Sequence, residues 1–107
     1  MTRGHDISIR QGGEHVRVVR DGQVLAESRR PLVLSETGCP MRYYLPPQDV
    51  RTELLTPSGT RTHCPFKGDA GYWSVPGGAD VAWAYADPRP EVAAIKDHLC
   101  FYDTEVL

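Results

Sequence analysis

The sequence is poor in cysteine and in long apolar segments. Its 107 residues include three cysteines (Cys39, Cys64 and Cys100) and no Cys-x-x-Cys pair, so we expect neither a disulfide framework nor a metal site. No apolar run approaches the ~20 residues that a membrane-spanning helix needs, and no apolar signal core precedes residue 7. These absences predict a cytoplasmic protein without a membrane partner.

Motifs of nucleic-acid and nucleotide chemistry are also missing. The chain has 12 Lys and Arg against 14 Asp and Glu and no basic tract, so nucleic acid is not an expected partner. Lys67-Gly68 lacks the glycine-rich run and the following Ser or Thr of a phosphate loop. Gly77-Gly78 is not followed by Ser or by the D-x-D pair that would hold catalytic metal ions. We therefore expect no cofactor, and these motifs leave open whether the protein is an enzyme.

Short runs of β-branched and aromatic residues, separated by Gly, Pro and Asp, fill most of the chain. Hydrophobic residues make up 40% and charged residues 24%, and the length suits a single domain over residues 1–107. The expected strands are residues 7–10, 16–20, 23–27, 32–35, 42–45, 61–64, 72–75, 81–85 and 100–102. This pattern predicts a mainly β (α+β) fold, a compact antiparallel sheet domain with two short helices.

Local signals place one hairpin in this framework. Asp21-Gly22 is typical of a type I′ turn, because both central positions of that turn need positive φ. Such a turn would put Val18 opposite Leu25 and Val19 opposite Val24.

The two helices are predicted from proline positions and apolar spacing. The first is expected to start at Pro47 and to end before Pro57, since proline is favoured at the first helical position. The second follows Pro90 and would bury Val92 and Ile95, which recur at helical spacing.

The segment from residue 61 to residue 85 contains most of the candidate site. We expect Gly68-Asp69 to form a hairpin turn that puts Cys64 opposite Trp73. One face would then carry His63, Lys67, Tyr72 and Ser74, and the other Cys64, Phe66, Trp73 and Val75. A second hairpin through residues 76–80 would pair Trp73 with Trp83 and leave Ala82 and Ala84 on the opposite face.

Two interpretations of this segment stay open. A helix could cover the small alanine side chains, or they could form the floor of a groove edged by His63, Lys67 and Tyr72. The groove would suit an anionic or aromatic small molecule, because Lys is a partner for phosphate or carboxylate and aromatic faces bind rings. Trp83 would be a core residue in the first case and a stacking surface in the second.

Two side chains of the segment are suited to catalysis. His63 is a candidate general acid or base, and Cys64 is a candidate nucleophile. No carboxylate that would orient His63 can be identified, and the expected register turns His63 and Lys67 away from Cys64. Adjacent strand residues point to opposite faces, so His63 and Cys64 are not expected to share a metal ion.

The run from Thr62 to Tyr72, Thr-His-Cys-Pro-Phe-Lys-Gly-Asp-Ala-Gly-Tyr, resembles the central motif of the family catalogued as domain of unknown function number 427. Further similar positions are Ser28-Arg29-Arg30, Tyr43-Tyr44-Leu45-Pro46, Trp83-Ala84-Tyr85 and His98-Leu99-Cys100-Phe101-Tyr102. The resemblance implies an antiparallel fold similar to the β-tent class, an aromatic ligand site and a nucleotidyltransferase-like label. The family-like positions within the site are His63, Cys64, Lys67, Gly68, Tyr72, Trp83 and Tyr85.

Three functions are compatible with these observations. We expect a binding domain for a small anionic or aromatic molecule, with His63, Lys67, Tyr72 and Trp83 as its ligand-binding residues. The alternatives are a nucleotidyltransferase-like enzyme and a protein-interaction module. We expect the protein to be a monomer or a weak homodimer.

Overall fold

The computed structural model describes residues 5–107, which form ten β-strands and three 3-10 turns without an α-helix in that range. The strands are β1 (Ile7–Gln11), β2 (Val16–Arg20), β3 (Gln23–Ser28), β4 (Leu32–Glu36), β5 (Arg42–Leu45), β6 (Thr56–Cys64), β7 (Gly68–Val75), β8 (Gly78–Tyr85), β9 (Leu99–Phe101) and β10 (Thr104–Val106). The turns are η1 (Pro47–Asp49), η2 (Thr52–Leu54) and η3 (Pro90–Ile95). No helical segment within residues 5–107 is long and apolar enough to cross a membrane.

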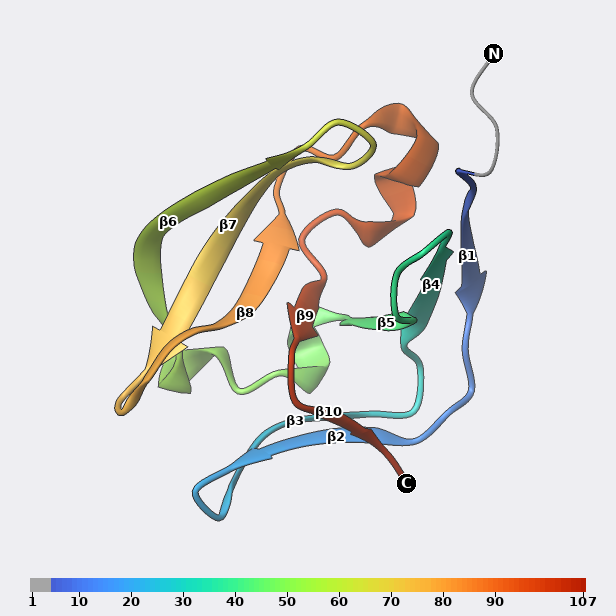
Figure 1. Ribbon diagram of the computed structural model, residues 1–107. Helices are drawn as coiled ribbons and strands as arrows, with labels where there is room; N and C mark the ends of the chain where they lie inside the picture. The colour runs from blue at the N-terminus through green and yellow to red at the C-terminus, as the bar shows by residue number, and fades with distance from the viewer. Residues whose placement is uncertain (1–4) are drawn as a thin grey trace.

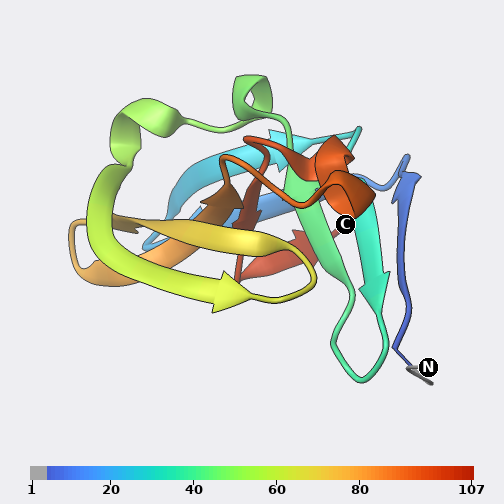
Figure 2. The ribbon, with the colours of Figure 1, turned by 90° about the horizontal axis from the view of Figure 1, so that it is seen from above.

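Seven strands form one curved antiparallel sheet in the order β1-β4-β5-β9-β8-β7-β6, and three form a small sheet in the order β10-β2-β3. The small sheet runs across the bottom of the molecule in Figure 1. Seen from above, the strands at the two ends of the large sheet run in very different directions (Figure 2), because the sheet twists along its width. The mainly antiparallel β fold predicted from the sequence is confirmed.

Two clusters of buried side chains cover the two faces of the large sheet. The inner cluster lies between the sheets and joins Val18 of β2 to Ala84 of β8. The outer cluster contains Trp83 and Tyr85 of β8 and is covered at one end by Ile95 of η3. From Ala82 to Tyr85, successive residues of β8 thus alternate between the clusters, as the pleat of a strand requires.

The first hairpin has the predicted turn and a partly different register. Asp21 and Gly22 have φ values of 50° and 78°, as a type I′ turn requires. The pair Val19–Val24 is present, but Val18 lies opposite Ala26 and not opposite Leu25. A β-bulge makes Leu25 an extra residue in β3, which a local pattern does not signal.

Both predicted helices are 3-10 turns. Between η1 and η2, Val50 has extended φ and ψ angles of −117° and 136° and forms a bridge with Ala26 of β3. This contact with a distant strand replaces the helical bonds that the sequence favours. The second helix is also absent as an α-helix, because η3 is kinked at Val92; Val92 and Ile95 are nevertheless buried, as predicted.

The hairpin of β6 and β7 has a register different from the predicted one. Its turn is Pro65-Phe66-Lys67, closed by a hydrogen bond from the Lys67 amide to the Cys64 carbonyl at 3.2 Å, and Cys64 lies opposite Gly68. The expected pair of Cys64 with Trp73 is therefore wrong. The shifted turn moves the side chains of β6 to the face opposite the one predicted, relative to those of β7. His63 and Tyr72 therefore lie on opposite faces of the hairpin.

The hairpin of β7 and β8 also differs from the prediction. Trp73 lies opposite Ala82, and Trp83 lies opposite Tyr72. Directly opposed residues share a face, so the two tryptophans are on opposite faces of the sheet. The expected pairing of Trp73 with Trp83 is wrong, and the alanine face is the one that carries Trp73.

Substitutions at two adjacent glycines that follow β1, Gly12 and Gly13, test how tightly this segment packs against β4. A Cβ atom at Gly12 would lie 2.8 Å from the Val33 side chain and 3.0 Å from the Pro31 carbonyl, whereas one at Gly13 would meet nothing within 4 Å. We expect Gly12→Ala to lower the free energy of unfolding by about 1–3 kcal/mol through overpacking. Gly13→Ala should change it by less than about 0.5 kcal/mol. Urea unfolding of both variants checks this, and equal midpoints would contradict it.

Candidate functional site

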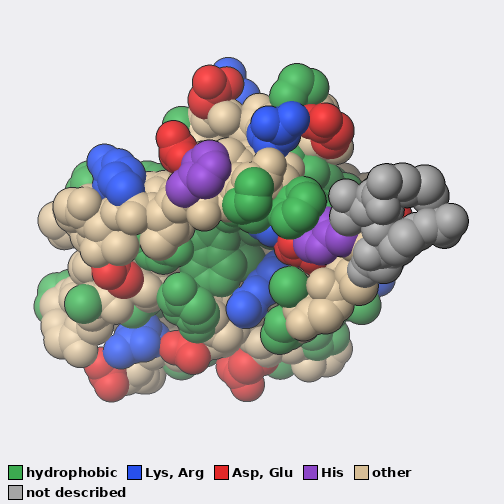
Figure 3. Space-filling view, turned by 45° about the horizontal axis from the view of Figure 1, so that its top comes forward, with side chains coloured by type: hydrophobic (Ala, Val, Ile, Leu, Met, Phe, Trp, Pro, Cys, Tyr) green, Lys and Arg blue, Asp and Glu red, His purple; other side chains and the backbone are tan. Residues whose placement is uncertain are grey.

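A recess of about 250 Å³ opens on the outer face of the large sheet. Figure 3 shows it as a hollow with hydrophobic side chains at its centre and basic side chains beside them. We call it the aromatic recess. Its lining residues are Leu34, Glu36, Cys39, Pro40, Arg42, Tyr44, Lys67, Tyr72, Trp83, Tyr85 and Tyr102.

One row of directly opposed residues crosses four strands beneath the recess. Tyr44 of β5 lies opposite Cys100 of β9, which lies opposite Trp83 of β8, which in turn lies opposite Tyr72 of β7. Cys100 is fully buried, and burial raises the pKa of its thiol to about 12. The thiol therefore stays protonated at neutral pH and acts as a small spacer between two aromatic rings.

Trp83 forms the floor of the recess. Its ring centroid lies 6.4 Å from that of Tyr72 and 4.6 Å from that of Tyr102. Its indole N–H donates a hydrogen bond to the Tyr44 hydroxyl at 3.3 Å. Because Trp83 is only 7% exposed while Tyr102 is 54% exposed, the indole is a fixed base and Tyr102 stands at the rim.

Two buried tyrosines supply neutral polar groups to the walls. Burial raises the pKa of Tyr44 and that of Tyr85 far above the usual value, so both phenols keep their protons. The Tyr44 oxygen accepts from Trp83, which leaves the Tyr44 hydroxyl hydrogen available as a donor.

Lys67 forms a buried ion pair at one side of the recess. Its Nζ lies 2.5 Å from Oε1 of Glu36, and the two side chains are 11% and 9% exposed. The second oxygen of Glu36 lies 3.1 Å from Nε2 of His5. Such a pair is expensive to desolvate and is kept only where both charges are well satisfied.

The backbone around Lys67 is held from both sides. Its amide donates to Cys64, and its carbonyl accepts from the Arg89 amide at 2.9 Å. The next residue, Gly68, has a φ of 116°, and a Cβ there would lie 3.3 Å from the Asp87 carbonyl. Only glycine fits this position without strain, so Gly68 fixes the direction in which Lys67 enters the recess.

Arg42 supplies a second cation to the recess. Its guanidinium carbon lies 5.2 Å from the centroid of the Trp83 ring and 5.9 Å from that of Tyr102, within the range of a cation–π interaction. No carboxylate among residues 5–107 forms an ion pair with it. The half-buried guanidinium thus keeps its hydrogen-bond donors available.

The structure brings together three of the four residues expected to bind ligand. Lys67, Tyr72 and Trp83 line the recess, but His63 does not. His63 contacts a carboxylate, with Nδ1 2.6 Å from Oδ1 of Asp69, yet the two side chains are 70% and 79% exposed on an open hairpin. Cys64 is half-buried at the end of β6 and is not part of the lining.

Sequence reasoning missed Arg42 and Glu36. Pairing of β4 with β5 puts Leu34 opposite Arg42. Glu36 follows Leu34 by two residues and therefore lies on the same face. Once this pairing was known, Arg42 and Glu36 could have been assigned to one face. The decisive contact, of β5 with β9, joins segments far apart in the chain, and no motif signals it.

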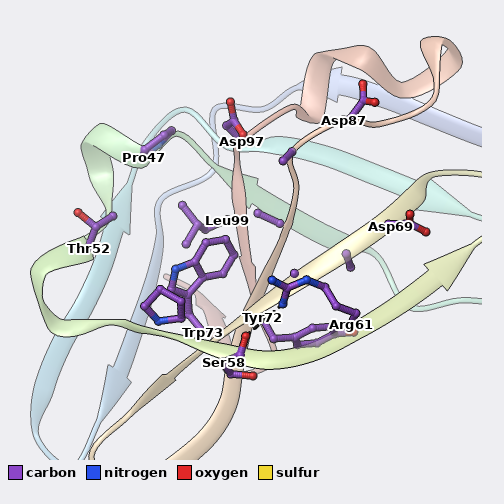
Figure 4. Close-up of a pocket in the computed structure, with 15 residues that line it drawn as sticks. Pro47, Thr52, Ser58, Arg61, Asp69, Tyr72, Trp73, Asp87, Asp97 and Leu99 are labelled. Carbon is purple, nitrogen blue, oxygen red and sulfur yellow. Dashed lines mark hydrogen bonds between the residues drawn. The ribbon is translucent and has the colours of Figure 1, made fainter.

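A larger pocket of about 660 Å³ lies on the inner face, beside the β6–β7–β8 hairpins. Its floor includes Gly71 and Ala84, which are directly opposed, together with Trp73 and Leu99. Figure 4 shows Trp73 and Leu99 in its centre, with Asp87 and Asp97 along one side. We call it the Trp73 pocket. Its remaining lining residues are Pro47, Thr52, Pro57, Ser58, Arg61, Asp69, Ala70, Tyr72 and Ala86.

These features define a class: a mainly antiparallel β domain with an aromatic hollow that contains a lysine and an arginine. Residues 8–107 match the family described as "Domain of unknown function (DUF427)", and the chain belongs to this family. A comparison with curated proteins finds no match. Within residues 5–107, no three His, Cys, Asp or Glu side chains come together as a metal site.

The ion pair of Lys67 and Glu36 can be tested through stability. We expect Lys67→Met to lower the free energy of unfolding by about 3–5 kcal/mol, because it leaves the Glu36 carboxylate buried without its partner. The double variant Lys67→Met, Glu36→Gln should regain much of the lost free energy of unfolding, because it no longer buries an unpaired carboxylate. A double-mutant cycle measured by urea unfolding checks this. Lys96→Met, at an exposed lysine, is the control, and an equal loss in both lysine variants would contradict the interpretation.

Proposed function

We propose that the protein binds a small planar carboxylate, such as an aromatic acid, in the aromatic recess. Arg42 carries the proposal. It lies against two aromatic rings and forms no ion pair among residues 5–107. A planar guanidinium that keeps its donors free is suited to bind a carboxylate through two parallel hydrogen bonds.

The other walls supply what the rest of such a ligand needs. The ring would pack on Tyr72 and on Tyr102 at the rim, above the buried Trp83, because the apolar faces of aromatic side chains bind planar groups in offset or tilted arrangements. The ammonium of Lys67 has three donors, and its contact with Glu36 uses one of them. The net charge of Arg42, Lys67 and Glu36 is positive, which favours an anion.

The shape of the site supports ligand binding over the two alternative functions. An interaction module needs an exposed apolar patch, whereas this apolar surface lies in a hollow with Trp83 buried at its base. An enzyme that used His63 as acid or base would need that side chain at the bound ligand, and His63 lies outside the recess lining.

Ligand class can be tested with benzoate and its neutral counterpart benzamide. We expect benzoate to raise the melting temperature, since a ligand at ~100 times its dissociation constant adds about 2.7 kcal/mol of stability. Benzamide should bind about tenfold more weakly or worse, because it lacks the charge that Arg42 meets. Equal binding of the two, or no shift with benzoate and other planar acids at millimolar concentration, would contradict the proposal. A Mg²⁺-dependent shift with nucleotides would favour the nucleotidyltransferase-like alternative.

The role of Arg42 can be tested separately. We expect Arg42→Met to weaken benzoate binding about tenfold or more, the loss of roughly 1.4 kcal/mol or more that a charged hydrogen bond contributes. Calorimetric titration measures this. Arg10→Met is the control, because Arg10 of β1 is exposed and pairs with Glu14, outside the recess lining. Unchanged binding by the Arg42 variant would remove the observation on which the proposal rests.

A further inference from the structure

The Trp73 pocket has a charge opposite to that of the aromatic recess and shares one lining residue with it, Tyr72. The two hollows lie on opposite faces of the hairpin formed by β7 and β8, because Trp73 and Trp83 point to opposite sides. At about 660 Å³, the Trp73 pocket falls in the usual range of small-molecule sites, roughly 300–1,000 Å³. The room comes from small residues: Gly71 and Ala84 face each other across the hairpin where larger side chains would fill the space.

Trp73 gives this pocket a recognition surface. The indole is half-buried, lies in the middle of the pocket (Figure 4), and is accompanied by Leu99. Its N–H donates no hydrogen bond to an acceptor in the part of the chain that the structure describes, unlike that of Trp83. Half-exposed tryptophan is the best side chain for contact with a cation, because the ring face is electron-rich.

Charge determines the kind of ligand. Three aspartates (Asp69, Asp87 and Asp97) and one arginine (Arg61) line the pocket. The Arg61 Nη1 donates to the carbonyls of Ser58 and Thr60 at 3.1 and 2.8 Å, so it is held by its own strand. Asp87 and Asp97 form no ion pair among residues 5–107. Carboxylates around an apolar cleft raise the local concentration of cations.

We propose that the Trp73 pocket is a second binding site, which takes an organic cation with an apolar group, such as a substituted amine or a quaternary ammonium. The cationic head would lie between the Trp73 ring and the carboxylates of Asp87 and Asp97. The apolar part would pack over Gly71 and Leu99. The site does not depend on the aromatic recess, since Trp73, Asp87 and Asp97 contribute nothing to that recess.

The test is a titration of isotope-labelled protein followed by NMR. The chain has two tryptophans, so its two indole N–H signals report the two hollows separately once Trp73→Phe has assigned them. Benzyltrimethylammonium should shift the Trp73 indole signal saturably and leave that of Trp83 in place. Sodium chloride at matched concentration controls for ionic strength. The absence of a saturable shift at millimolar concentration, or an equal shift of both indoles, would overturn the proposal.

A matched pair of glycine variants tests the location. A Cβ at Gly71 would meet only the Arg61 side chain, at 3.8 Å, and one at Gly13 would meet nothing. Because a Cβ at Gly71 has room, we expect the fold to accept valine there and its side chain to occupy part of the pocket. We expect Gly71→Val to reduce binding of the ammonium probe about tenfold or more, and Gly13→Val to leave it unchanged. Undiminished binding by folded Gly71→Val would place the probe elsewhere and overturn the proposal.

The carboxylates can be removed without changing shape. Asp97 has a φ of 60°, which Asn tolerates well, so the double variant Asp87→Asn, Asp97→Asn should fold. It should bind the ammonium probe several-fold more weakly while benzoate, which reports the aromatic recess at Trp83, is unaffected. Unchanged affinity for the ammonium probe would overturn the assigned charge preference. A benzoate response without an ammonium response would contradict only the proposed site in the Trp73 pocket. An ammonium response without a benzoate response would contradict only the proposed site in the aromatic recess.

Discussion

The register of β7 against β8 determines what each face of the large sheet can do. With Tyr72 opposite Trp83 and Gly71 opposite Ala84, two large aromatic side chains meet on the outer face, and two small residues leave space beside Trp73 on the inner face. A shift by one residue would mix the two sets. The outer face then could not form a continuous aromatic floor, and the inner face would lose its open space. The aromatic recess and the Trp73 pocket are both consequences of this single pairing.

The two cations of the aromatic recess have different roles. Lys67 is committed to Glu36 in a buried pair, and its backbone is tied to Cys64 and Arg89. It therefore holds the hairpin end against β4 and gives the recess a rigid side. Arg42 rests on aromatic rings and has no competing carboxylate among residues 5–107. One charge fixes the wall of the recess, and the other is not paired with a carboxylate of this part of the chain.

Much of the fold could be predicted from the sequence, because alternation and turn residues are local signals. All nine expected strands are present, and the Asp21-Gly22 turn has the backbone angles its residues predict. The strand β10 was not predicted: its three residues are too short a run to show an alternating pattern, and they are ordered by pairing with β2. The site could be predicted only in part. Lys67, Tyr72 and Trp83 come from one segment, whereas Arg42 reaches them through β9, a contact between distant parts of the chain.

The position of β9 in the chain has a consequence for biosynthesis. This strand, Leu99–Phe101, lies between β5 and β8 and is the only link through which the two halves of the large sheet are hydrogen-bonded within residues 5–107. A ribosome-bound chain that has not yet extruded these three residues holds two groups of strands with unpaired inner edges. Such edges are prone to pair with other chains. The large sheet therefore cannot be completed until β9 has been synthesised, and we expect a chain that ends before residue 99 to be an aggregation-prone fragment rather than a shortened domain.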